Sequence, residues 1–314
     1  MKRRDFLKSS VAVSAAFGFS GITALAPRNA QAATINTTLR AEGTYKTLVD
    51  NSSHFVWQFS DTSGATGPGA LASGLMVREG DTVNITIENN LDRSIRFSIE
   101  GVAMSSTRSV NSGASRTYSF TAPAAGSYMY TDNLNGELGR AMGLAGPMVV
   151  MPANGSNSLY NGGPAFDRQY TLFMSEMDDR LNAAIESGSS YNMANYEPNY
   201  FFANGLSYPD TKTDNDTLVS MYLSEDVGIR FINGGAITYP MHFHGYHVNV
   251  ATRNRTVETR VIEKDSVQVE RNECVDVILP VAQRGAYPLH THYVPGVTAN
   301  GSYANGGLII MNAS

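Results

Sequence analysis

Two histidine pairs are the residues of this chain best suited to chemistry. The chain has six histidines among 314 residues, and four of them form the motifs His242-Phe243-His244 and His290-Thr291-His292. On a β-strand, residues i and i+2 lie on one face, about 6.5–7 Å apart, so each motif presents two imidazoles in one direction. Neutral imidazole is a ligand for copper, zinc, iron and nickel, and neither cysteine nor paired carboxylates lie beside these motifs. The pattern indicates a nitrogen-only metal site; the alternative is four ordinary histidines with local hydrogen-bond partners.

Short strands must position these imidazoles. Alternating apolar and polar residues separated by Gly, Asp and Asn are typical of antiparallel strands, as in residues 83–87 and 227–233. The second segment repeats the first after 144 residues, and a strand that begins at Gly126 recurs at Gly285, after 159 residues. A duplicated unit with a small insertion explains both offsets. The sequence therefore predicts an all-β protein of two tandem Greek-key β-sandwiches, whose only helix is a short one around residues 178–187.

Composition divides the chain into four parts. Residues 1–32 begin with Arg3 and Arg4 ahead of an apolar stretch and end in an A-x-A cleavage site, as a secretory signal does. The paired arginines resemble a twin-arginine export signal, which predicts a periplasmic protein; an ordinary secretion signal is the alternative. We expect the first domain at residues 33–152, a polar Gly/Ser/Asn linker at 153–168, and the second domain at 169–314.

Charge and composition exclude several classes of protein. The net charge of −5 becomes −9 once residues 1–32, with five cations and one anion, are removed. An acidic chain lacks the basic face that a nucleic-acid partner requires. A single cysteine rules out an intrachain disulfide, and after residue 32 no run reaches the roughly 18 apolar residues of a membrane span.

These motifs resemble those of the multicopper oxidases, in particular the two-domain cupredoxin-like members and the related copper nitrite reductases. The resemblance covers nearly all of the predicted mature chain and is carried by four segments: residues 79–83 (EGDTV), 143–150 (GLAGPMVV), 204–209 (NGLSYP) and 241–245 (MHFHG). It implies two cupredoxin-like domains and copper as the cofactor. In that family, eight histidines hold a three-copper cluster, and a cysteine, two further histidines and usually a methionine hold a separate blue copper.

The chain departs from the family pattern at the blue copper. The cysteine position is Thr291, the two histidine positions are Tyr239 and Gly296, and the axial methionine falls near residues 307–308. Thiolate is the ligand that defines a blue-copper site, so the sequence predicts that this site is lost. Cys274 lies sixteen residues before His290, in a different predicted strand, and is expected to pack in the core.

The first-domain ligands of the cluster have been replaced as well. The two offsets align the four histidines with Ser98, Glu100, Thr131 and Asn133. Four imidazoles can hold one ion or two, and Glu100 is a candidate either for an extra oxygen ligand or for a carboxylate that holds an imidazole N–H. His247 is expected on the opposite strand face and His54 in a structural role.

Three functions fit this depleted site. The first is a copper-dependent oxidoreductase acting at a non-blue, His-ligated copper on oxygen, nitrite or another small molecule, with zinc replacing scarce copper. The second is copper binding and handling without turnover, and the third is a metal-free scaffold of the same fold. In the two-domain relatives the cluster lies between domain 1 of one subunit and domain 2 of the next, so the resemblance also implies a homotrimer.

Overall fold

The computed structural model describes residues 32–61 and 74–314, so residues 1–31 of the predicted export signal lie outside the described residues. The strands before residue 152 form two four-stranded sheets, ordered β2-β1-β4-β6 and β3-β8-β7-β5. Their bounds are β1 Thr34–Thr47, β2 Ser53–Asp61, β3 Leu75–Arg78, β4 Thr82–Asn89, β5 Phe97–Ile99, β6 Ser115–Thr121, β7 Gly126–Asp132 and β8 Ala145–Met151. The inner faces of the two sheets enclose one apolar core around Trp57, Phe97 and Tyr118. We call this β-sandwich domain 1.

The later strands form a second, larger sandwich, domain 2. One sheet has nine strands, in the order β15-β14-β18-β12-β9-β10-β20-β21 with β16 paired to β14, and the other has five, β11-β22-β19-β13-β17. Their bounds are β9 Arg168–Met177, β10 Tyr200–Ala203, β11 Val219–Met221, β12 Asp226–Asn233, β13 Tyr239–Phe243, β14 Val248–Arg253, β15 Thr256–Val257, β16 Glu263–Lys264, β17 Ser266–Val269, β18 Cys274–Pro280, β19 Gly285–Thr291, β20 Thr298–Ala299, β21 Ser302–Tyr303 and β22 Leu308–Ala313. The all-β, two-sandwich fold predicted from the sequence is confirmed, while the limits set for the domains and linker stay predictions.

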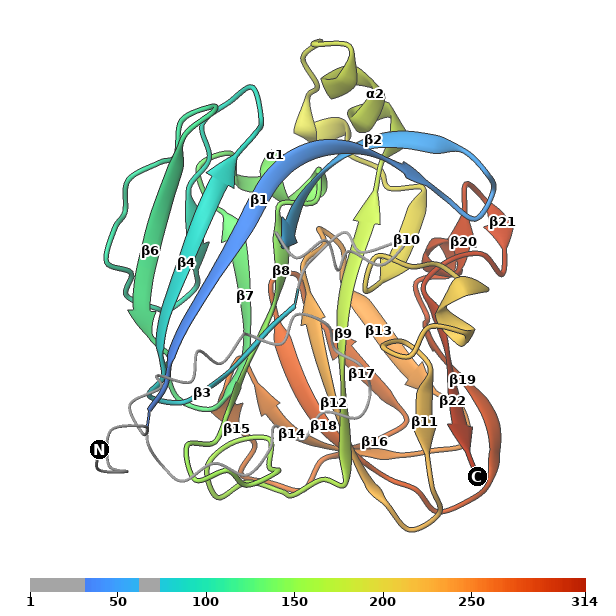
Figure 1. The fold of residues 1–314 in the computed structure, drawn as a ribbon. Coiled ribbons are helices and arrows are strands. Elements are labelled where there is room, and N and C mark those ends of the chain that lie inside the picture. Colours follow the sequence, from blue (N-terminus) through green and yellow to red (C-terminus); the bar gives the residue numbers. More distant parts are fainter. Residues whose placement is uncertain (1–31, 62–73) are drawn as a thin grey trace, which may run out of the picture.

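The two sandwiches stand side by side, and a hairpin of domain 1 reaches across to domain 2 (Figure 1). Strand β2 pairs over its whole length with Leu39–Thr47 of β1, and the turn between them at residues 48–52 lies over β10. There Leu48 and Val56 pack with Met177, Tyr200 and Phe202 of domain 2 in a small apolar cluster. Burial of these side chains holds the hairpin on domain 2.

A buried polar network also joins the domains. Arg230 and Asp276 are both almost fully buried, with Arg230 Nη1 lying 3.3 Å from Asp276 Oδ2. The hydroxyl of Ser127, on β7 of domain 1, donates to Asp276 at 2.5 Å, and Thr252 donates to the same carboxylate at 2.9 Å. Arg230 donates further to Gln169. A buried charge requires such partners, since alone it would lose its hydration without compensation.

The predicted helix forms as α2, Asp179–Glu186, but the prediction that it is the only helix was wrong. A second helix, α1, spans Gly136–Ala141, and short 3-10 turns cover η1 Met193–Asn195, η2 Asp210–Lys212 and η3 Val294–Val297. Two glycines make the α1 segment look like a loop in the sequence. Gly139 is needed for packing, because a Cβ there would lie 2.8 Å from the Asp132 carboxylate. Among the described residues, none of these helices is long and apolar enough to cross a membrane.

Candidate metal centre

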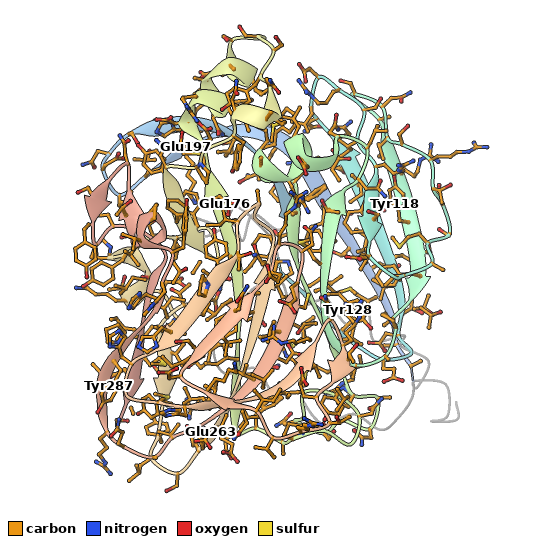
Figure 2. The ribbon with its side chains drawn as sticks, turned by 180° about the vertical axis from the view of Figure 1, so that it is seen from behind. Tyr118, Tyr128, Glu176, Glu197, Glu263 and Tyr287 are labelled. Atoms are coloured by element: carbon orange, nitrogen blue, oxygen red, sulfur yellow. The ribbon has the colours of Figure 1, made fainter. Side chains whose placement is uncertain are left out.

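The two H-x-H motifs lie at the ends of neighbouring strands of the five-stranded sheet, with His244 and His292 one residue past β13 and β19. In the antiparallel ladder of β13 and β19, His242 is directly opposite His290. The alternate residues Met241, Phe243 and Leu289 fill the core of domain 2. The histidines therefore share the outer face of the sheet, on the side of the molecule away from domain 1 (Figure 1). Figure 2 shows the same separation, with Tyr287 of β19 and Tyr118 of domain 1 at opposite edges.

The structure brings all four predicted imidazoles together. The ring centroid of His242 lies 4.7 Å from the centroids of both His244 and His292. The ring centroid of His290 lies 5.1 Å from that of His244 and 5.4 Å from that of His292. Nε2 of His244 is 2.9 Å from Nε2 of His290. His244 and His292 are exposed, whereas His242 and His290 are partly buried. The cluster is thus an open, shallow patch of nitrogen donors.

Local hydrogen bonds orient two of the rings. Nδ1 of His290 lies 3.0 Å from the backbone carbonyl oxygen of Thr291. Nδ1 of His242 lies 3.1 Å from the backbone carbonyl oxygen of Asp265 and 2.9 Å from the Ser266 hydroxyl. Because a carbonyl only accepts, each Nδ1 carries the proton, and each Nε2 keeps its lone pair. An imidazole whose Nδ1–H is held by a hydrogen bond, with a lone pair left at Nε2, is the usual arrangement of a metal-bound histidine.

Burial, and to a smaller extent the neighbouring rings, disfavours protonation of His244 and His290. Desolvation lowers the pKa of His244, and the neighbouring His242 and His292 lower it further. The pKa of His290 is lowered mainly by burial, which outweighs its hydrogen bond to Thr291. Both shifts favour the neutral imidazole, the form that binds metal.

The rings fit a metal by donor chemistry but need a small adjustment. Among the described side chains, no three His, Cys, Asp or Glu groups are already arranged to hold an ion. Two nitrogens bound at 2.0–2.1 Å to one tetrahedral ion lie about 3.3 Å apart. The 2.9 Å contact between His244 and His290 is shorter, as expected for two imidazoles that share a proton. Replacing that proton with an ion requires the rings to separate by a few tenths of an ångström.

The corresponding positions in domain 1 confirm the alignment between the two halves. Ser98 of β5 is directly opposite Thr131 of β7, as His242 is opposite His290. Asn133 accepts a hydrogen bond from Arg96, so these positions serve the local structure of domain 1. Glu100 is exposed in the turn after β5, and the next residue, Gly101, faces Arg255 of domain 2 rather than the histidines. No contact within the described chain brings Glu100 to the cluster.

Side chains of other types occupy the positions aligned with the blue-copper ligands. Thr291 is buried, and a Cβ at Gly296 would come within 2.5 Å of its methyl group. Leu308 pairs with His290 in the sheet ladder. Tyr239 is fully buried and donates to the carboxylate of Glu176 at 2.5 Å. Glu176 is a buried partner that sequence reasoning missed, although a glutamate in the apolar run of β9 was a visible signal.

The remaining candidates lie away from the cluster. Cys274 packs between the domains with Met129, Phe173 and Ile232, and burial raises the pKa of its thiol. His247 is exposed and contacts none of the four clustered rings among the described residues. His54 accepts or donates to the Ser52 hydroxyl at 2.8 Å and packs 5.2 Å from the ring of Tyr200.

Paired sandwiches of this kind define a two-domain cupredoxin-like protein, and comparisons with known proteins agree. Two family models, both described as multicopper oxidase, match residues 68–155 and 183–304. The chain belongs to the multicopper oxidase superfamily. A search of curated proteins finds no match.

Solved structures share the fold. The multicopper oxidase mgLAC superimposes with a TM-score of 0.75 at 21% identity, over 90% of this chain and 87% of its own. The blue copper oxidase from Nitrosomonas europaea superimposes with a TM-score of 0.74 at 20% identity, over 89% of this chain and 86% of its own. The copper nitrite reductase from Nitrosomonas europaea superimposes with a TM-score of 0.69 at 20% identity, over 90% of this chain and 94% of its own. At these identities the likeness establishes the fold alone.

Proposed function

We propose that this protein binds copper through His242, His244, His290 and His292 and acts as an oxidoreductase at that non-blue site. The observation that carries the proposal is the convergence of four imidazoles on one sheet face, two of them with the proton held at Nδ1 so that Nε2 keeps its lone pair. Bound copper would supply one-electron transfer to a small molecule such as oxygen or nitrite. The chain's own part is to orient His242 and His290 through their Nδ1 hydrogen bonds and to favour the neutral form of His244 and His290.

Copper handling without turnover is the second candidate. The exposure of His244 and His292 favours it, because an open patch lets an ion exchange with a partner. Copper analysis combined with an oxygen- or nitrite-consumption assay distinguishes the two, since both functions require bound copper and only the first requires consumption. A protein that takes up neither copper nor zinc would instead be a metal-free scaffold.

We also propose that the protein works in the periplasm after twin-arginine export. The support is the sequence of residues 1–32, with Arg3 and Arg4 ahead of the apolar stretch. Cell fractionation of the wild type and of an Arg3→Lys/Arg4→Lys variant checks this, and periplasmic delivery of the variant at the wild-type level would contradict it.

The copper-loaded protein should be pale. Intense blue colour comes from a thiolate bound to Cu(II), and Thr291 stands where the family has cysteine. We expect no strong absorption at about 600 nm in the Cu(II) protein. A strong band there would contradict the proposal, and its loss in Cys274→Ser would show that the buried Cys274 had become the ligand.

We propose that three chains assemble head to tail in a ring. Support comes from the resemblance and from the separation within one chain of the exposed histidine face and Glu100. Val294 and Tyr303, each 75% exposed, follow the histidine strands and present apolar surface for a neighbour. Light scattering of the chain without residues 1–32 should give three times the mass of one chain. The mass of a single chain, at all concentrations and with or without copper, would exclude the ring.

A further inference from the structure

A cavity of about 180 Å³ lies at the boundary between the two domains. Its walls come from α1 of domain 1, from β9, from η1 and Tyr196, and from the loops before β13 and β18. The volume is more than ten times the roughly 10–15 Å³ that one water needs. Neither the four clustered histidines nor Thr291 and Gly296 contribute to the walls, so the cavity is separate from the candidate metal centre. Figure 2 shows Glu176, one of its lining residues, in the interior of the molecule.

Arg140 of α1 is the key residue of the cavity. It is partly buried, and its only hydrogen bond among the described residues goes to the side-chain oxygen of Asn272. No carboxylate lies within ion-pair distance of its guanidinium in the described part of the chain. A guanidinium has five N–H donors in a planar fork that matches a carboxylate, so most of its donors are left for a ligand.

The other charged groups of the cavity are already engaged. Arg271 forms an ion pair with Glu137. The carboxylate of Glu176 accepts from the Tyr239 hydroxyl and from the backbone N–H of Ala236, and burial raises its pKa despite these bonds. Arg140 is therefore left as one cation without a contacting anion. A cation that is partly withdrawn from water without a contacting anion favours a bound counter-ion.

Two further features describe the ligand. The hydroxyl of Ser175 is buried beside the cavity and has no hydrogen-bond partner among the described residues. The side chains of Ala141 and Met193 supply apolar wall. One unpaired cation matches one negative charge, whereas a phosphate dianion would be repelled by the nearby carboxylates Glu137 and Glu176.

We propose that this cavity binds a small organic monocarboxylate, whose carboxylate pairs with Arg140 and accepts from Ser175 while its apolar body contacts Ala141 and Met193. The ligand would contact elements of both domains. Its binding should therefore stabilise the folded, docked arrangement of the domains as well as fill the cavity.

Titration calorimetry with benzoate, acetate and inorganic phosphate at constant ionic strength and pH 7 tests this. We expect benzoate to bind with a Kd below about 1 mM, acetate more weakly, and phosphate at least tenfold more weakly than benzoate. Arg140→Gln should weaken benzoate binding at least tenfold, and Ser175→Ala several-fold. Arg108→Gln is the matched control, because Arg108 is exposed in domain 1 and does not line the cavity.

Three results would overturn the proposal: no benzoate uptake by the wild type at about 10 mM, phosphate binding as tight as benzoate, or unchanged benzoate affinity in a folded Arg140→Gln variant. If Arg140→Gln does not fold, Ser175→Ala decides, since removing one hydroxyl leaves the packing intact; an unchanged affinity there would then reject the assignment. A rise of the wild-type melting temperature with benzoate, absent with phosphate, is the expected independent readout.

Discussion

The double variant His244→Ala/His290→Ala should lose its copper, falling from about one ion per chain to below about 0.1. These two rings have the closest donors of the cluster, with Nε2 atoms 2.9 Å apart, and they come from different strands. Removing both leaves His242 and His292, each without its strand neighbour. Two imidazoles on an exposed surface do not complete the coordination of Cu(II) or Zn(II). Metal analysis after dialysis against a weak chelator measures the loss.

His247→Ala is the matched control for this experiment. His247 is exposed like His244, lies three residues further along the chain and contacts none of the clustered rings in the described structure. The control should keep its copper, and both variants should keep the wild-type circular dichroism, because His244 is exposed and His290 only partly buried. Wild-type copper content in the double variant would show that the metal binds elsewhere.

Sequence reasoning found the histidine cluster because it depends on local geometry. Alternation on a strand determines which side chains share a face, so His242 and His244 could be placed together without a structure. The internal repeat then identified the equivalent positions, and the ladder confirms it, with Ser98 opposite Thr131 as His242 is opposite His290. The distances between the imidazole rings could not be predicted from the sequence, because they depend on side-chain torsions and on hydrogen bonds to Thr291 and Asp265.

Other features could not be predicted because they arise between distant segments. Arg230 and Glu176 are conspicuous as charges in apolar strands, but the sequence does not say that their partners are Asp276 and Tyr239. The cavity next to Arg140 exists only where domain 1 meets domain 2. Helix α1 was missed because its two glycines have poor helix propensity, and tertiary packing against Asp132 compensates for them.

The largest effect on folding is expected from Asp276→Asn. This change keeps the shape of the side chain but removes its charge, which leaves the guanidinium of Arg230 buried without a counter-ion. Burial already lowers the pKa of Arg230 against the opposing influence of Asp276. Breaking a buried pair from one side costs about 3–5 kcal/mol, so the free energy of unfolding should fall by about that amount. Urea denaturation at pH 7 measures it.

The companion variant Arg230→Met/Asp276→Leu separates two contributions to the free energy of unfolding: the destabilisation caused by one unpaired buried charge, and the net stabilisation given by the intact ion pair. Because both charges are removed, no buried ion is left without a partner, and apolar replacements of similar size often restore stability. We therefore expect the double variant to be more stable than Asp276→Asn, although Ser127 and Thr252 lose their acceptor. Asp92→Asn, in the exposed pair with Arg93, should leave the urea midpoint near that of the wild type. If Asp276→Asn unfolds at the same urea concentration as Asp92→Asn, the network does not stabilise the contact between the domains, and the packing of β1 and β2 on β10 must supply that stability instead.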